Sequence, residues 1–461
     1  MINLKPGWTL STIGELAPYV QRGKSPKYTD CSELPVINQK CIRWNKLETQ
    51  HLKFIHPDQI AAWDSARYIC PGDILWNSTG TGTVGRAYLI SETDCVTPKV
   101  VDSHVTIVRG CNQIDQRYLF NWIKGPLVQQ KIEEMCDGTT NQIELSRRAI
   151  TETKIPIAPF DEQKRIADKL DAVLAHVDTC RDRLDRIPAI LKRFRQSVLA
   201  AASSGKLTKD WRSLPSEIIL EVEVKEPYAH IVQGPTSWIQ RSLGEVCDFI
   251  GGSQPPKSTF ISEASDDVVR LIQIRDYKTE KFKVFIPLKL ARRFCNKTDV
   301  MIGRYGPPIF QILRGIEGAY NVALMKAEPK IPSLELDYLF LWLKGETLLR
   351  YVEAGSTRTA GQDGISKELL FPYPFFLPPV EEQREIIRRV ESLFTYADRL
   401  EAHYTTSRAQ VEKLTPALLA KAFRGELVLQ DPNDEPAREL LARIAAAKPS
   451  QTRKKATRKP S

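Results

Sequence analysis

The feature that most constrains the fold is an internal repeat at an offset of 220 residues. The segment YLFNWIKG at 118–125 returns as YLFLWLKG at 338–345, and DEQKRI at 161–166 returns as EEQREI at 381–386. A solenoid repeat is about 20–50 residues long, so this repeat is too long to be a solenoid. The chain is therefore predicted to be a duplication, in which each copy contains one domain and one connecting segment.

Each half follows the same order of signals. A tryptophan and a short helix signal come first, then a turn, a glycine-rich stretch, the Tyr-Leu-Phe helix and a small polar segment. The paired segments are the turns 23–26 and 252–255, the glycine-rich stretches 71–89 and 299–313, and the polar segments 138–142 and 355–358. Short β-like runs lie between them. Each half is predicted to be a mixed α/β domain of about 150 residues.

The connecting segments have a heptad pattern. Apolar residues from Ile166 to Val198 recur at alternating intervals of four and three, and the pattern returns at an offset of 220 with one lapse at Ser407. Such a stripe requires a partner helix. The predicted seam residues are Ile166, Leu170, Val173, Val177, Leu184 and Leu191, with Ile386, Val390, Leu393, Leu400, Val411 and Leu414 in the second copy. The two helices are predicted to pack antiparallel around a pseudo-two-fold axis, each about 60 Å long.

The predicted fold class is α+β, with two mixed α/β domains joined by two long helices in an antiparallel coiled coil. Pro188 and Pro416 are expected to kink or restart the helices locally. The predicted segments are a first domain 1–158, a first helix 159–206, a linker 207–236, a second domain 237–378, a second helix 379–426 and an extension 427–461 with a basic, disordered tail.

The composition favours a protein that works in a reducing compartment and has a mild basic excess. The net charge is +10, but six cations and no acid lie in 448–461, which leaves +4 for the rest. This excess is compatible with DNA binding and does not establish it. The nine cysteines have no C-x-x-C spacing, which argues against zinc sites and a disulfide framework. No signal peptide or apolar run of 18 residues is present, so a cytoplasmic protein is expected.

No catalytic site can be assembled from the motifs. The run 80–87 spaces glycines like a phosphate loop, yet Arg86 and Ala87 stand where lysine and a hydroxyl are required. The run 306–310 lacks the side chain that would hold a target amine, and no cofactor loop precedes it. The six histidines form no metal-spaced pair. The acid pairs at 161–162 and 381–382 begin helices, where they favour the macrodipole.

In its ordered set of motifs, the chain resembles the specificity subunit of type I restriction-modification systems. The segments that carry the resemblance are PFDEQKRI and PPVEEQREI, SVLAAASSGKL and ALLAKAFRGEL, PGDILWNSTGTGTVGRAYLI, GKSPKY, and GTTNQI with GSTR. The resemblance covers nearly the whole chain apart from the basic tail. The second half departs from the first in its glycine-rich loop, where it has RYGPP at 304–308.

The resemblance implies a non-catalytic subunit that reads a bipartite, asymmetric sequence in double-stranded DNA. Each domain would read one half-site, and the two helices would fix the gap between them. The implied partners are two methyltransferase subunits and the restriction/translocase subunits, with no membrane. The chain itself would hold no cofactor or metal, because S-adenosylmethionine, ATP and magnesium belong to the partners. The implied location is the cytoplasm of a bacterium or archaeon.

Reading bases requires long polar side chains, and positioning the DNA backbone requires hydroxyls, glycines and cations. The candidate DNA-binding residues of the first domain are Lys24, Ser78, Thr81, Thr83, Arg86, Thr139, Thr140, Asn141 and Gln142. Those of the second domain are Lys257, Arg275, Arg304, Tyr305, Ser356, Thr357, Arg358 and Gln362.

Two alternatives remain at this point. A coiled-coil scaffold that clamps two partners without reading DNA would explain the heptads, but not two divergent domains rich in loops. A fused methylase-nuclease-specificity enzyme would require catalytic motifs, and the sequence has none.

Overall fold

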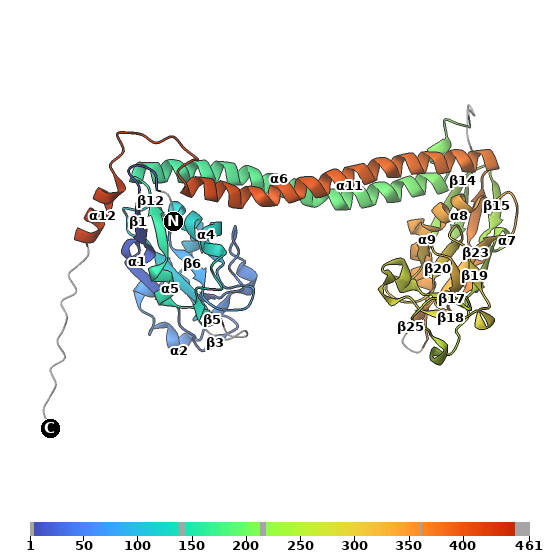
Figure 1. Cartoon of the computed structure of the whole chain (residues 1–461), viewed down its shortest axis with the longest axis horizontal. Coiled ribbons are helices and arrows are strands. Elements are labelled where there is room, and N and C mark those ends of the chain that lie inside the picture. Colours follow the sequence, from blue (N-terminus) through green and yellow to red (C-terminus); the bar gives the residue numbers. More distant parts are fainter. Residues whose placement is uncertain (1–3, 138–142, 213–217, 360–361, 448–461) are drawn as a thin grey trace, which may run out of the picture. The chain divides into compact units, whose positions relative to one another are not determined.

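The chain forms two compact units, which we describe separately from a computed structural model (Figure 1). The structure describes residues 4–137, 143–212, 218–359 and 362–447. The first unit contains Met1–Leu184 and Thr406–Ser461, and the second contains Asp185–Thr405. Two long helices, α6 (Phe160–Ser203) and α11 (Val380–Phe423), each contribute one end to each unit. Both helices have 44 residues, at the 220-residue offset of the sequence repeat.

The first unit contains short strands and short helices around one end of each long helix. Its strands are β1 (Thr9–Thr12), β2 (Tyr19–Arg22), β3 (Tyr28–Thr29), β4 (Pro35–Ile37), β5 (Lys53–Ile55), β6 (Ile74–Asn77), β7 (Ala87–Leu89), β8 (Val100–Val101), β9 (Val105–Arg109), β10 (Cys136–Asp137), β11 (Glu144–Leu145) and β12 (Lys154–Ile157). Its shorter helices are α1 (Ile13–Leu16), α2 (Pro57–Ile60), α3 (Gln116–Lys124), α4 (Pro126–Gln129), α5 (Arg147–Glu152), α12 (Ala437–Ala446) and the 3-10 turns η1 (Thr49–His51), η2 (Ser65–Arg67) and η3 (Thr93–Cys95).

The second unit has the same kinds of elements. Its strands are β13 (Ile219–Val224), β14 (His230–Pro235), β15 (Ile239–Ser242), β16 (Cys247–Gly251), β17 (Val268–Ile272), β18 (Phe285–Pro287), β19 (Phe294–Cys295), β20 (Val300–Gly303), β21 (Gln311–Leu313), β22 (Gly318–Tyr320), β23 (Leu324–Pro329), β24 (Thr357–Thr359), β25 (Gln362–Gly364) and β26 (Pro374–Leu377). Its shorter helices are α7 (Leu243–Val246), α8 (Leu336–Leu343), α9 (Glu346–Gly355), α10 (Lys367–Leu370) and the 3-10 turns η4 (Lys206–Thr208), η5 (Lys257–Thr259), η6 (Ile274–Tyr277), η7 (Glu280–Phe282) and η8 (Leu288–Leu290).

The two units share a sheet topology. A sheet of order β2-β9-β6-β7 in the first unit matches β16-β23-β20-β21 in the second. A second sheet contains one parallel pair in each unit, β4 with β8 and β17 with β22. The first and last strands of each domain also pair, because Thr9 faces Ile157 and Ile239 faces Leu377. Each domain therefore begins and ends at one place, immediately before its long helix.

The long helices pack together in opposite directions, as the heptad pattern predicts. In the first unit, Ile166 and Leu170 near the start of α6 share a hydrophobic core with Phe423 at the end of α11. The Phe423 ring lies 4.9 Å from the Tyr118 and Trp122 rings of the domain. In the second unit the end of α6 and the start of α11 share a core. In each unit the start of one long helix lies beside the end of the other, so the two helices run antiparallel.

The seam differs from the prediction at two positions of α11. Most predicted seam residues are buried or half-buried, but Leu400 is 39% exposed and Leu414 is 43% exposed. The neighbouring Thr415 is half-buried instead. Leu393 and Val411, predicted seam residues before and between these two leucines, are half-buried, so Leu400 and Leu414 are the more exposed members of the predicted seam.

The prolines do not restart the helices. Pro188 lies inside α6 and Pro416 inside α11, and each helix continues on both sides. A proline removes one backbone hydrogen bond and adds a local clash. Each helix nevertheless runs through its proline without interruption, so the expected restart is wrong.

Two segments predicted to be a linker or an extension are folded onto the units. Within the linker 207–236, β13 and β14 form an antiparallel hairpin, and Val224 belongs to the core of the second unit. In the extension, α12 buries Leu440 and Ile444 in the core of the first unit. The linker was predicted from the prolines of this segment, although its apolar residues alternate as in a β-strand. The predicted disordered tail, 448–461, lies outside the described residues.

The repeated Glu-Gln pair fixes the start of each long helix to its domain. Glu162 and Glu382 are buried, and each accepts a hydrogen bond from a tryptophan indole, Trp8 at 3.0 Å and Trp238 at 2.8 Å. The neighbouring Gln383 donates to the Pro378 carbonyl at 2.9 Å and accepts from the Glu335 N–H at 2.8 Å. Gln163 makes the same pair of contacts in the first unit. The acids therefore hold the tryptophans, beyond the helix-start role predicted from the sequence.

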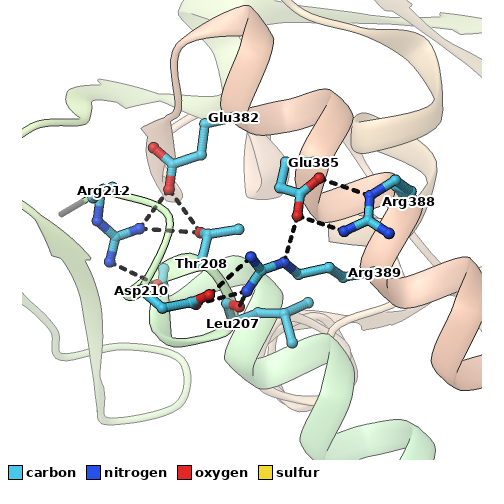
Figure 2. A network of polar contacts seen from close by, with 9 residues as sticks. Leu207, Thr208, Asp210, Arg212, Glu382, Glu385, Arg388 and Arg389 are labelled. Carbon is cyan, nitrogen blue, oxygen red and sulfur yellow. Dashed lines mark hydrogen bonds and ion pairs between the residues drawn. The ribbon is translucent and has the colours of Figure 1, made fainter.

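The electrostatic surroundings of the two buried glutamates differ. In the second unit Glu382 accepts from Thr208 at 2.7 Å and forms an ion pair with Arg212, whose side chain is 4% exposed (Figure 2). Next to this pair, Arg389 bridges Asp210 and Glu385. In the first unit, burial raises the pKa of the Glu162 carboxyl, against the lowering effect of its hydrogen bonds. The buried glutamate of the second unit, Glu382, is therefore ion-paired with an arginine, whereas Glu162 in the first unit accepts hydrogen bonds from Trp8 and Gln430.

Replacing Glu382 should strongly destabilise the second unit. Glu382→Ala takes the carboxylate away from a buried guanidinium and an indole N–H, and breaking a buried ion pair costs about 3–5 kcal/mol. Glu381→Ala is the matched control, because this neighbour is exposed and its ion pair with Arg384 at 3.1 Å lies at the surface. Denaturant-dependent hydrogen exchange of the full chain measures the free energy of unfolding of each unit separately. An equal effect of the two substitutions would contradict the proposed importance of Glu382.

Candidate nucleic-acid interface

Several loops of the first domain meet at one rim. The Ser25 hydroxyl, after β2, contacts the Ser103 hydroxyl at 2.6 Å, and the Thr79 hydroxyl, after β6, contacts His104 Nδ1 at 2.6 Å. The Asn77 side-chain amide donates to the Gln39 carbonyl at 3.1 Å. The loops after β2, β4 and β6 and the turn between β8 and β9 are thereby joined. We call this set of loops the first rim.

Strand β11 connects the polar segment 138–142 to the first rim. Thr79 forms a β-bridge with Glu144, and Arg22 forms an ion pair with the same glutamate. Strands β10 and β11 pair on either side of the segment. The candidate residues Thr139, Thr140, Asn141 and Gln142 themselves lie outside the described residues.

The other candidates of the first domain differ in their accessibility. Lys24 and Thr81 are exposed, whereas Thr83 is half-buried and lies 3.2 Å from the Gln39 side-chain oxygen. Arg86 is also half-buried and donates to the Gly82 carbonyl at 2.7 Å, so the glycine-rich loop folds back on its own arginine. Ser78 is fully buried and bonds Thr106 at 2.5 Å. Ser78 is therefore a structural residue of the sheet and not part of the exposed surface.

The second domain builds a related rim, which we call the second rim. Arg304 donates to the Ile365 carbonyl at 3.1 Å, and Tyr305 forms a β-bridge with Gly364. The guanidinium of Arg304 also lies 5.3 Å from the centre of the Tyr305 ring. Strands β24 and β25 thus meet the loop after β20, as β10 and β11 meet the loop after β6.

The remaining candidates of the second domain lie on or near these loops. Lys257 and Arg275 are exposed, and Ser356 is half-buried with its hydroxyl bonded to the Glu353 carbonyl at 3.0 Å. The backbones of Thr357, Arg358 and Gln362 form β24 and β25, whereas their side chains lie outside what the structure describes.

A pair of glycines explains why both rims bend at the same point. A Cβ on Gly23 would lie 2.1 Å from the Asp102 carbonyl oxygen, and one on Gly252 would lie 2.0 Å from that of Asn321. Real Cβ atoms do not come this close to backbone oxygens, so both turns require glycine. The repeated turns predicted at 23–26 and 252–255 therefore allow the loop to pass against the end of the parallel strand pair.

Sequence reasoning missed several residues of the first rim. Gln39 and Lys40 lie in the loop after β4, and Ser103 and His104 lie in the turn before β9. Three of these residues, Gln39, Lys40 and His104, line a polar pocket of about 430 Å³ together with Lys53 and the buried Asp102. The available signal was a run of polar residues after an apolar strand, which is also typical of an ordinary loop.

Among the residues that the structure describes, no group of three or more His, Cys, Asp or Glu side chains is placed to hold a metal ion. The described helices include none that is both long and apolar enough to span a membrane. What the rims offer is cations, amides and hydroxyls on loops, which are the groups that contact DNA phosphates and base edges.

Comparisons with known proteins agree with this geometry. The family model for the type I restriction modification DNA specificity domain matches residues 5–189 and 235–408. The chain is 35% identical over 430 residues to the EcoBI specificity subunit of Escherichia coli, covering 84% of this chain and 87% of that protein. It is 28% identical to the EcoKI specificity subunit of E. coli strain K12, covering 99% of both chains.

A solved structure shows the same fold. The HsdS subunit from Thermoanaerobacter tengcongensis superposes with a TM-score of 0.57 at 20% identity, covering 92% of this chain and 98% of that one. The duplicated domains, the antiparallel helices, the paired rims and the two matches of the family model lead to one conclusion. The chain belongs to the family of DNA specificity subunits of type I restriction-modification systems.

Proposed function

We propose that this chain reads a bipartite, asymmetric DNA sequence, with one half-site bound at each rim. The observation that carries the proposal is that both rims are built from equivalent loops but present different side chains. Thr79 in the first rim is replaced by Tyr305 in the second, and Lys40 by Arg275. Equivalent backbones with different side chains suit two half-sites of different sequence.

The chain would act as a non-catalytic subunit. It would position two methyltransferase subunits on the DNA and direct restriction by a translocase/nuclease subunit. S-adenosylmethionine, ATP and magnesium would bind to these partners and not to this chain. The specificity subunits to which the chain is similar support this assignment. The assembly would work in the cytoplasm, where bacterial or archaeal DNA is accessible to it.

Methylation mapping tests the proposal. Long-read sequencing of a genome that carries the methyltransferase subunits, with and without this chain, should reveal one bipartite motif that depends on the chain. The purified chain alone should turn over no S-adenosylmethionine. A scaffold that does not read DNA would instead leave methylation independent of sequence. Turnover by the chain alone, free of partner subunits, would contradict its non-catalytic role.

A further inference from the structure

The polar pocket of the first rim has a buried acid in its wall. Asp102 is 3% exposed, and it lines the pocket together with Lys40 and Lys53. Both lysines are exposed. The pocket therefore combines cations that are accessible to DNA phosphates with one recessed carboxylate, which a phosphate would not approach.

The fold does not require a negative charge at this position. Asp102 Oδ1 accepts from the His104 N–H at 2.9 Å and closes the turn between β8 and β9. In the second domain the equivalent Asn321 accepts from the Ala323 N–H at 3.2 Å in the same way. The equivalence is set by the backbone, because Asp102 N donates to the Ile37 carbonyl at 3.0 Å and Asn321 N to the Ile272 carbonyl at 3.1 Å. A neutral amide closes this turn equally well.

The turn therefore does not explain why residue 102 carries a carboxylate and not an amide. With Oδ1 used in the turn, Oδ2 remains as an acceptor. Burial raises the pKa of the Asp102 carboxyl, against the lowering effect of the His104 N–H and of nearby Lys53 and Arg22. When bound DNA displaces the water from the pocket, an acceptor in its wall is costly unless a donor of the DNA replaces that water. In the major groove, the donors that DNA presents are the amino groups of cytosine N4 and adenine N6.

We propose that Asp102 reads one base of the half-site bound by the first domain, by accepting a hydrogen bond from the exocyclic amino group of cytosine or adenine. This inference rests on the proposed function. Lys40 and Lys53 flank the pocket and offset the charge of the carboxylate with contacts to the backbone. Asp102 thus determines specificity at one position, and the lysines contribute affinity that does not depend on sequence.

The second domain suggests an informative substitution. In Asp102→Asn the side-chain oxygen stays in the turn, as it does in Asn321, so the pocket receives an NH₂ group. The free group changes from an acceptor to a donor, which favours the acceptors guanine O6 and thymine O4. At one position of the first half-site, the ratio of methylation between the two kinds of base should shift by about 10- to 100-fold.

The experiment uses the chain assembled with its methyltransferase subunits. The DNA is randomised in the first half-site with the second held constant, and methylated molecules are sequenced. The wild-type chain should select cytosine or adenine on one strand at the Asp102 position, and this result identifies which amine is read. Asp102→Asn should change that base alone. Identical selection by both chains at every position would overturn the role of Asp102.

The reciprocal substitution is the matched control. Asn321→Asp places an acceptor in the second rim, and it should change one position of the second half-site and none of the first. The thermal unfolding midpoints of both variants should match the wild type, because the turn hydrogen bond remains. If Asp102→Asn lowers the thermal unfolding midpoint, the test is made with Asn321→Asp instead. A second half-site that this variant leaves unchanged overturns the inference. If the wild type itself selects no sequence, the proposed function fails instead.

Discussion

Replacing residues 1–158 with the first domain of another family member should change one half-site of the methylated motif completely and leave the other unchanged. The physical reason is that β1 and β12 pair, so that the segment begins and ends at one place. Its contacts with the helices include a buried hydrogen bond and a cluster of aromatic rings. Trp8 binds Glu162, and the Tyr118 and Trp122 rings pack on Phe423. A donor domain with a tryptophan at its start and the Tyr-Leu-Phe-x-Trp helix keeps all of these contacts.

Methylation mapping of the chimaera measures the outcome, and exchange of residues 237–378 provides the reciprocal. That exchange should alter the other half-site only, because β15 and β26 close the second domain in the same way. A change in both half-sites after a single exchange would mean that the rims read DNA jointly, and the assignment of one domain to one half-site would be wrong.

Adding one heptad to both long helices, after Leu174 and after Phe394, should lengthen the gap between two unchanged half-sites. Both insertion points are half-buried positions of the helix packing, and seven residues nearly restore the apolar face. The added length is about 10 Å at 1.5 Å per residue, which corresponds to roughly 3 bp of DNA at 3.4 Å per step. The expected optimum is therefore a gap about 3 bp longer.

Rotation limits how well the longer coil fits the DNA. Three base pairs turn the DNA by about 100°, taking about 10–10.5 bp per turn, whereas the coil face drifts by about 20°. We expect weaker methylation at the new gap, with an optimum within one base pair of it. The control adds a single residue at each place, which turns the following face by about 100° and should abolish specific methylation. An unchanged gap with full methylation in the heptad variant would show that the helices do not set the spacing.

The sequence by itself determined the long helices and the duplication. The sequence predicts α6 and α11, which have equal length at the 220-residue offset, because a heptad pattern is local and repeats every seven residues, about two helical turns. The heptad pattern does not give the exposure of each seam residue, and Leu400 and Leu414 are more exposed than the other predicted members. Nor could the sequence show that 219–235 folds as a hairpin, since the prolines suggest a linker and the packing partner lies elsewhere in the chain.

Only the tertiary structure decided the roles of the polar residues. The sequence predicts only a helix-start role for Glu162. Its hydrogen-bond partner Trp8 is 154 positions away, so the contact could not be inferred from neighbouring residues. Gln39, Asp102 and His104 each look like ordinary loop residues, and they line one pocket because β4 pairs in parallel with β8. Helix periodicity depends on near neighbours, and a chain therefore displays it in its sequence. A rim depends on which strand ends meet, and that is settled when the sheets pair and pack.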